Sequence, residues 1–212
     1  MAEKQAAPTK PKPRRYDSSR RSRQAEQTRR EVLMAALDLF NERGWSGTTL
    51  AAIAERAGVA VETIYSGFGS KKGLLRATVD VGVVGDTEPV PFAEREEAAR
   101  MTRGSREARL RAATEIQTDI HERLAGVWQA VVAAASSDEE VDGWRKELDD
   151  GRRIDTRRFL ALIYEREIDE HVVDLIWALF SSEVYWKLTR DVGWSRSEYE
   201  TWLYTAMERV VD

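Results

Sequence analysis

The sequence contains no cysteine among its 212 residues. This absence excludes disulfide bonds, thiol nucleophiles and cysteine-bound metal sites, and a reducing cytoplasm is the simplest location for such a chain. Long apolar runs are also missing, because none approaches the roughly 18 residues of a membrane span. The first 23 residues lack the apolar stretch of a signal peptide. We therefore expect a cytoplasmic protein that does not bind a membrane.

Histidine is scarce, and each of the two residues can be interpreted in two ways. His171 has Glu167 and Asp174 at helical spacing, and His121 follows Asp119, so each histidine has a carboxylate that could share a metal ion or a proton. One histidine per cluster is more typical of a structural or surface residue. Nothing in the sequence resembles a nucleophile, a phosphate loop or a catalytic dyad. We expect no enzyme activity, no metal site and no cofactor.

The remaining composition is that of a folded globular protein, with 42% apolar and 33% charged residues. The overall charge of −4 hides an asymmetry along the chain. Residues 1–76 carry 15 Lys and Arg against 8 Asp and Glu, whereas residues 77–212 carry 18 against 29. The basic N-terminal part alone suits a polyanionic partner.

The chain divides into three predicted parts. Residues 1–23 hold eight Lys and Arg with hardly any apolar side chains, which predicts a flexible basic arm. That arm is either a solvated tail or a segment that reaches along a DNA minor groove. Residues 24–76 and 77–212 form the two folded parts, with a hinge expected near Gly85, Pro89 and Pro91.

Hydrophobic periodicity predicts an all-α fold, since no strand pattern competes with the helical stripes. The N-terminal helices are expected over 24–43, 49–57 and 61–68, with a fourth beginning at Lys71. The C-terminal helices are expected over 94–102, 105–123, 125–136, 138–165, 167–190 and 196–211.

The second and third predicted helices have the spacing of a helix-turn-helix. Their crossing requires a small residue at the contact, and the turn requires a glycine that adopts a positive φ. Ala54 meets the first requirement, Gly58 meets the second, and Ile64 returns to the core six residues later. The helix over 61–68 is then free to face a groove.

The residues around this turn resemble the tetracycline-repressor (TetR) family over about residues 28–76. The resemblance rests on Thr48-Thr49-Leu50, Ile53-Ala54, Ala57-Gly58-Val59, Thr63-Ile64-Tyr65, Phe68 and Ser70-Lys71. It implies an N-terminal three-helix helix-turn-helix domain, followed by a C-terminal helical bundle for effector binding and dimerisation. It also implies a repressor more often than an activator.

The resemblance places the helix over 61–68 in the major groove of DNA. Its expected DNA contacts are Val61, Glu62, Thr63, Ser66 and Gly67 near base edges, and Thr48, Thr49, Tyr65 and Lys71 on phosphates. Hydroxyl groups, a lysine and helix N-termini are independently the groups that satisfy phosphate oxygens. The alternative is that Tyr65 and Thr63 only pack and cap a short helix.

Two positions depart from the family pattern. Ala60 stands where Ser or Thr is usual, so the helix over 61–68 lacks a side-chain N-cap worth about 1 kcal/mol. Gly67 stands where an aromatic residue or His is common, and a glycine there lets the backbone approach DNA closely.

The acidic part is rich in aromatic residues, which indicates either a ligand pocket or core packing. For the pocket we nominate His121, Trp128, Trp144 and Tyr164, because the resemblance implies an effector among the middle helices. For a dimer interface we nominate six residues on the apolar faces of the last two predicted helices: Val172, Leu175, Ile176, Leu179, Trp202 and Ala206. These faces must be covered either by a second copy across a twofold axis or by other helices of the same chain.

Together these features predict a homodimeric regulator bound to double-stranded operator DNA. It would act as a repressor that a small-molecule effector releases from a palindromic operator. Two alternatives remain, a non-specific architectural DNA binder and a small-molecule binding protein with a vestigial helix-turn-helix. Deletion of residues 1–23 would separate the architectural binder from the regulator.

Overall fold

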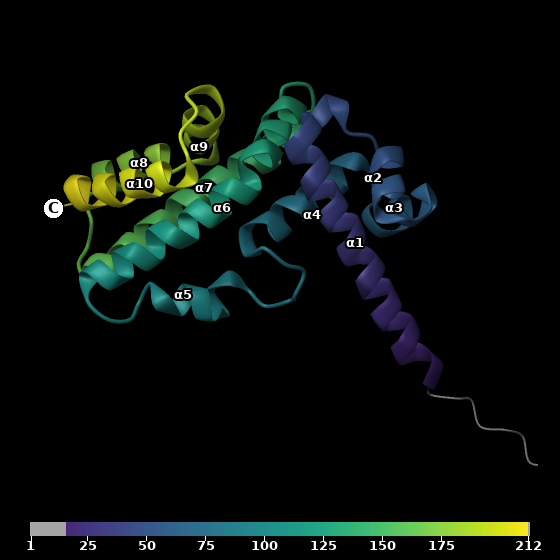
Figure 1. Ribbon diagram of the computed structural model, residues 1–212, viewed down its shortest axis with the longest axis horizontal. Coiled ribbons are helices and arrows are strands. Elements are labelled where there is room, and N and C mark those ends of the chain that lie inside the picture. Colours follow the sequence, from purple (N-terminus) through teal and green to yellow (C-terminus); the bar gives the residue numbers. More distant parts are fainter. Residues whose placement is uncertain (1–15, 212) are drawn as a thin grey trace, which may run out of the picture.

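The computed structural model describes residues 16–211, and all regular structure in that range is helical, as predicted (Figure 1). The N-terminal elements are α1 (Tyr16–Gly47), α2 (Leu50–Ala57), α3 (Val61–Phe68) and α4 (Lys71–Val84). The C-terminal elements are η1 (Phe92–Glu94), α5 (Glu96–Arg100), α6 (Arg106–Ala135), α7 (Glu139–Tyr164), α8 (Glu170–Leu179), α9 (Ser182–Trp186), η2 (Lys187–Asp191) and α10 (Arg196–Val211). The first group lies on one side of the molecule and the second on the other.

Helix α1 begins at Tyr16, eight residues before the expected start at residue 24. Residues 16–23 are therefore helical rather than part of a flexible arm, and residues 1–15 of the predicted arm lie outside the described residues. The expected stop at Gly44 is present as a kink with φ 63° and ψ −168°, after which one more turn continues to Gly47. Only glycine adopts this φ without strain.

Helices α2, α3 and α4 begin within one residue of their predicted starts. The Thr49 hydroxyl oxygen accepts from the backbone N–H of Ala52 at 3.1 Å, and the Ser70 hydroxyl oxygen accepts from that of Gly73 at 3.1 Å. Ala60 precedes α3 with no side-chain cap. A side chain therefore satisfies one of the four free N–H groups at the start of α2 and of α4, and none at the start of α3.

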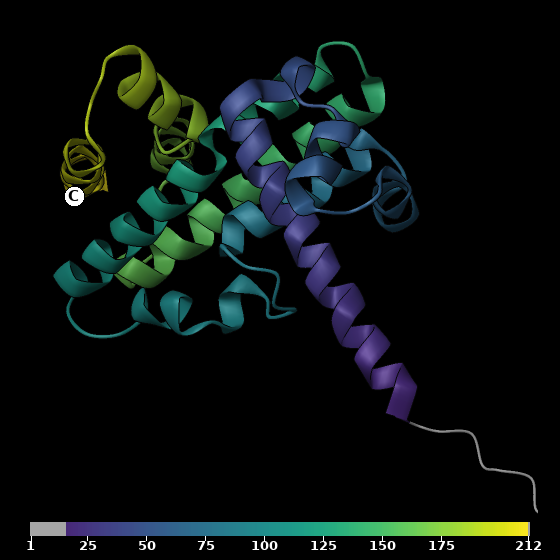
Figure 2. The same cartoon turned by 45° about the vertical axis from the view of Figure 1, so that its right-hand side comes forward.

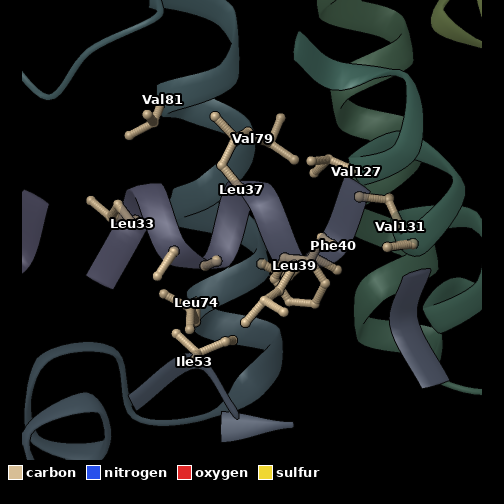
Figure 3. Packing of buried hydrophobic residues seen from close by; sticks show 14 of the residues in the cluster. Leu33, Leu37, Leu39, Phe40, Ile53, Leu74, Val79, Val81, Val127 and Val131 are labelled. Atoms are coloured by element: carbon tan, nitrogen blue, oxygen red, sulfur yellow. The ribbon is translucent and has the colours of Figure 1, made fainter. Parts of the chain in front are cut away.

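The buried core of the N-terminal part continues into the C-terminal part (Figure 3). Phe40 and Leu37 of α1 pack in one cluster with Leu74 and Val79 of α4 and with Val127 of α6. The predicted division after residue 76 falls inside α4, which runs from Lys71 to Val84. The helix-turn-helix part is therefore not an independently packed unit, because α6 supplies part of its core.

Asn41 of α1 joins the two parts through its side-chain amide. Its Nδ2 donates to the carbonyl of Arg123 at 2.9 Å, and its Oδ1 accepts from the backbone N–H groups of Gly126 at 2.9 Å and Val127 at 3.1 Å. A Cβ at Gly126 would lie 2.7 Å from the Cα of Asn41. The glycine thus allows α1 and α6 to approach backbone to backbone.

The C-terminal helices differ from the prediction at two breaks. The expected helices over 105–123 and 125–136 are one continuous helix, α6, with no break at residue 124. The expected helix over 167–190 is divided into α8, α9 and the π-helical turn η2, with Phe180 leaving the helical conformation at φ −97° and ψ 65°. The short helix expected over 94–102 corresponds to α5, and η1 lies just before it.

A second buried cluster lies between α6, α7, α8 and α10. Its largest fully buried members include Tyr199, Leu160, Ile163 and Leu203. Helix α6 contributes to both clusters and runs through the middle of the molecule in Figures 1 and 2. It is consequently the element that connects the two parts.

Candidate DNA-binding interface

The turn between α2 and α3 has the predicted geometry. Gly58 adopts the left-handed conformation with φ 67° and ψ 32°, and the backbone N–H of Val59 donates to the carbonyl of Ala54 at 3.0 Å. Ala54 is buried at the helix crossing, and Ile64 of α3 points into the core. The small contact residue, the turn glycine and the returning apolar residue are all confirmed.

Helix α3 presents nearly all of its surface to solvent, because Ile64 is its one buried residue. Its exposed residues are Glu62, Thr63, Tyr65, Ser66 and Gly67, and Val61 and Phe68 are half-buried. Tyr65 leaves 55% of its surface exposed, so it is not a core residue. A short helix with a polar face and one buried anchor is the form that fits into a major groove.

Thr48 does not lie on the exposed face, which corrects the prediction that it binds phosphate. Thr48 is 0% exposed, and its hydroxyl points inward, where its one hydrogen is shared between the carbonyls of Leu39 at 3.0 Å and Gly44 at 2.8 Å. The hydroxyl therefore satisfies carbonyls left open by the kink in α1. Thr48 is a structural residue.

A first surface hollow gathers the predicted phosphate contacts. Its lining residues are Ser46, Thr48, Thr49, Leu50, Ala51, Val61, Tyr65, Ser70 and Lys71. The N-termini of α2 and α4 both open into it, after Thr49 and Ser70. First-turn N–H groups and the positive end of the helix dipole favour an anion at such a place.

Lys71 lies at the edge of this hollow and is held by Trp45. Its ammonium nitrogen donates to the Trp45 carbonyl and lies 4.0 Å from the centroid of the Trp45 ring. Partial burial lowers the pKa of Lys71, because the charged form loses hydration. The ammonium group has three donors, so a phosphate oxygen can be bound while the Trp45 contact persists.

Gly67 has open space where a side chain would stand, since a Cβ there would meet nothing within 4 Å. Its φ does not lie in the left-handed region, so the fold itself does not require glycine at this position. The effect of Gly67 is to leave the outer face of α3 flat.

The four pocket residues nominated in the C-terminal part do not form one group. His121 and Trp128 lie two turns apart on α6, and Arg152 of α7 lies with its guanidinium carbon 5.9 Å from the Trp128 ring centroid. Trp144 packs in the cluster shared with the helix-turn-helix part. Tyr164 lies at the end of α7, where its hydroxyl donates to the Met207 carbonyl at 2.9 Å.

His121 is fully enclosed in a polar cluster. The Gln117 Nε2 donates to the His121 Nε2 at 2.7 Å, so the other ring nitrogen carries the proton and donates to the Tyr199 hydroxyl at 2.8 Å. Burial lowers the pKa of His121 to about 3, with the nearby Arg152 acting in the same direction. The imidazole is therefore neutral at physiological pH. Among residues 16–211 no group of three or more His, Cys, Asp or Glu is placed to hold a metal ion.

The six residues nominated for dimerisation divide by exposure. Leu175 is 52% exposed, and Val172, Leu179, Trp202 and Ala206 are half-buried. Ile176 is buried in the second cluster of its own protomer, so it presents no surface to a partner and that assignment is corrected.

Sequence reasoning missed two sets of contacts around the helix-turn-helix. Arg56 of α2 holds Glu42 of α1 through two hydrogen bonds of 2.7 and 2.9 Å, which fixes α2 against α1. A row of residues on α1 borders a second hollow beside α3. Its residues follow helical spacing from Arg21 to Val32, a periodicity that is visible in the sequence once a helix is assumed there.

The fold and the exposed face of α3 together define a helix-turn-helix domain of the DNA-binding class. The family profile described as "Bacterial regulatory proteins, tetR family" matches residues 32–78. AlkX of Mycobacterium tuberculosis is 48% identical over 48 residues, which is 23% of each chain. TtgR of Pseudomonas putida is 43% identical over 61 residues, which is 29% of each chain. Both are named as transcriptional regulators, and residues 32–78 of this chain are similar to the N-terminal domain of that family.

The similarity to these curated relatives spans less than a third of their length, whereas the similarity in fold extends over most of the chain. A TetR-family regulator from Rhodococcus sp. superposes with a TM-score of 0.66 at 18% identity, covering 88% of this chain and 99% of that one. LfrR of Mycobacterium smegmatis, solved in complex with proflavine, gives 0.59 at 21% identity, covering 88% and 97%. Within residues 16–211 no helix is long and apolar enough to cross a membrane.

Proposed function

We propose that this chain is a homodimeric transcriptional repressor that binds a palindromic operator and is released by a small-molecule effector. The observation that carries this proposal is the exposed polar face of α3, bordered by a hollow into which the N-termini of α2 and α4 open. The named relatives of this domain are regulators of transcription.

In the proposed complex α3 lies in the major groove. Thr49, Tyr65 and Lys71 bind phosphates, together with first-turn N–H groups of α2 and α4. Glu62, Thr63 and Ser66 reach base edges, with Glu62 accepting from a cytosine amino group. The flat surface left by Gly67 brings the backbone of α3 close to the floor of the groove, with Val61 beside it.

Release by an effector requires that movement in the C-terminal part reaches α3, and α4 offers the connection. Lys72 of α4 forms ion pairs with Asp138, at 3.3 Å, and with Glu140, both at the start of α7. Arg123 of α6 donates to the carbonyls of Gly82 and Val83 at the other end of α4, at 2.8 and 3.1 Å. A shift of α6 and α7 would therefore move α4 at both ends and change the separation of the two recognition helices.

We place the effector beside His121 and Trp128, where α6 faces α9 and α10. The Trp128 indole N–H donates to Glu183, so an aromatic ring, a carboxylate and a buried imidazole lie along one side of α6. That a protein of this fold was solved with proflavine supports a small organic ligand. Coupling of about 1–3 kcal/mol, or 5- to 150-fold in operator affinity, would suffice for regulation.

We propose that two copies associate through α8 and α10, using Val172, Leu175, Leu179, Trp202 and Ala206. Leu175 is the most exposed of these apolar residues and would be covered by the partner. A twofold dimer presents two copies of α3 to half-sites one helical turn apart, as a palindrome demands.

The experiment that tests the proposal is selection of bound duplexes from a random DNA library by the full chain, followed by sequencing. We expect an enriched near-palindrome, and Tyr65→Phe should bind it roughly 100-fold more weakly, because each of the two protomers loses one hydrogen bond to a charged phosphate that contributes roughly tenfold. Binding without sequence preference, with a steep salt dependence, would indicate an architectural DNA binder instead. No DNA binding at all would indicate a small-molecule binding protein with a vestigial helix-turn-helix.

A further inference from the structure

Helix α1 extends beyond the packed body of the molecule. In Figures 1 and 2 its N-terminal turns project past α2 and α3 into open space. Residues 20–27 are exposed on every side, so no core residue of the protein stabilises these turns. A helical segment of roughly a dozen residues is only marginally stable in water without tertiary packing. Contact with a binding partner would therefore stabilise these N-terminal turns of α1.

One face of this extension borders the DNA-reading face of α3. A second hollow lies between them, and its residues from α1 are Arg21, Gln24, Ala25, Thr28, Arg29 and Val32. We call these six residues the α1 stripe. The opposite wall of the hollow is formed by Glu62, Thr63, Ser66, Gly67 and Phe68 of α3. The same α3 residues that would enter a groove of DNA therefore look onto the α1 stripe.

The orientation of the stripe is fixed by packing at its C-terminal end. The guanidinium carbon of Arg29 lies 4.6 Å from the centroid of the Phe68 ring, which holds α1 against the end of α3. Val32 is buried in the core, one turn further along. Because the helix is continuous from Tyr16, the position of Arg21 relative to α3 follows from these two contacts.

The charges of the extension favour a polyanion. Residues 20–30 contain five arginines and a single carboxylate, Glu26, which accepts a hydrogen bond from Ser22 one turn earlier. Ser22 and Glu26 lie on another side of the helix from Arg21, since successive residues are about 100° apart. The stripe itself presents Arg21, Gln24 and Thr28, which are side chains that bind phosphate oxygens.

We propose that the α1 stripe is a second DNA-binding surface, which contacts backbone phosphates bordering the groove that holds α3. This inference rests on the proposed function, because it assumes that α3 lies in a major groove. The stripe binds phosphate and reads no base, so it adds affinity and fixes the position of α3 without changing the preferred sequence.

The test compares Arg21→Ala with Arg23→Ala in the full chain. Both substitutions remove one arginine from an exposed turn and introduce the best helix former, so they change charge and helix propensity equally. Arg23 lies about 200° around the helix from Arg21 and therefore off the stripe. Binding of the selected operator and of a scrambled duplex is measured by fluorescence anisotropy from 50 to 300 mM salt, with circular dichroism as a check on helix content.

We expect Arg21→Ala to weaken binding to both duplexes by about 10- to 100-fold per dimer at low salt, whereas Arg23→Ala changes it by less than about threefold. The slope of log affinity against log salt should fall by about 1.8 for Arg21→Ala, since two phosphate contacts are lost per dimer. Methylphosphonate substitution at single phosphates should then identify one whose neutralisation weakens the wild type and leaves Arg21→Ala unaffected.

Equal effects of the two substitutions, or an unchanged salt slope for Arg21→Ala, would overturn the proposed role of the stripe. The operator selected by the wild type would still be bound in that case, so the proposed function would stand. If the wild type selects no operator, the proposed function is wrong. The proposed role of the α1 stripe is then wrong as well, because it requires a complex with α3 in the major groove.

Discussion

Replacing Gly126 by alanine should force α1 and α6 apart. The new Cβ would lie 2.7 Å from both the Cα and the side-chain Oδ1 of Asn41, and 2.9 Å from the Asn41 carbonyl oxygen. Two of these three atoms belong to the backbone, which cannot rotate away as a flexible side chain could. Overpacking of this kind destabilises by about 1–3 kcal/mol. Alanine favours a helix over glycine by about 0.5–1 kcal/mol. Subtracting this gain from an overpacking cost of about 3 kcal/mol leaves an expected net loss of stability of about 2 kcal/mol.

The assay is thermal unfolding followed by circular dichroism. For a chain of this size 1 kcal/mol corresponds to roughly 2–4 °C, so Gly126→Ala should lower Tm by roughly 4–8 °C. Gly143→Ala is the matched control, because Gly143 is exposed within α7 and a Cβ there would meet nothing within 4 Å. That control should raise Tm by roughly 1–4 °C. If Gly126→Ala melts at or above the wild type, the close approach of α1 and α6 is wrong.

Three further predictions concern single side chains. Ala60→Ser should add the missing N-cap of α3 and raise the free energy of unfolding by about 1 kcal/mol, seen as a higher midpoint in urea; an unchanged midpoint would mean that the start of α3 is satisfied otherwise. Thr48→Val should lower stability by about 1–3 kcal/mol, because it leaves two carbonyls without their hydroxyl partner, and a loss of DNA affinity at unchanged Tm would contradict the buried placement. His121 should make stability fall with acid, since its pKa is about 3 in the folded state against 6.5 in the unfolded chain. The unfolded chain then binds one more proton between these values, so the free energy of unfolding drops by about 1.4 kcal/mol per pH unit as pH falls below 6.5. Urea titrations at pH 7, 6 and 5 measure this slope, and His121→Gln should remove it.

The helix-turn-helix could be predicted from sequence because each of its features is local. The apolar spacing around Ile53 in α2 and Ile64 in α3, the turn at Gly58 and the N-cap at Ser70 each depend on residues only a few positions away in the sequence. Their bounds in the structure agree with the prediction to within one residue at α2 and α3. Local signals of this kind do not depend on which distant segment packs against them.

The features that sequence did not predict either depend on how the folded chain surrounds a residue or leave no local signal at all. Thr48 could bind phosphate by chemistry alone, and it is the kink at Gly44 that turns its hydroxyl inward. The close approach of α1 and α6 at Gly126 depends on Asn41, which lies 85 residues earlier in the chain and leaves no local signal at the glycine. The N-terminal turns of α1 lack any apolar periodicity, so composition alone favoured a flexible arm.

The shared core explains why a DNA-binding domain of this construction can respond to the rest of the chain. Phe40 is fully buried, and part of what covers it is Val127 and Val131 of α6 rather than another helix of the N-terminal part (Figure 3). A rotation of α6 that changes the packing around His121 must also change the packing of Val127 and Val131 against Phe40, because these residues belong to one continuous helix. Close-packed interiors do not absorb such a change gradually. The position of α1, and with it the α1 stripe and α3, is thereby tied to the packing around α6.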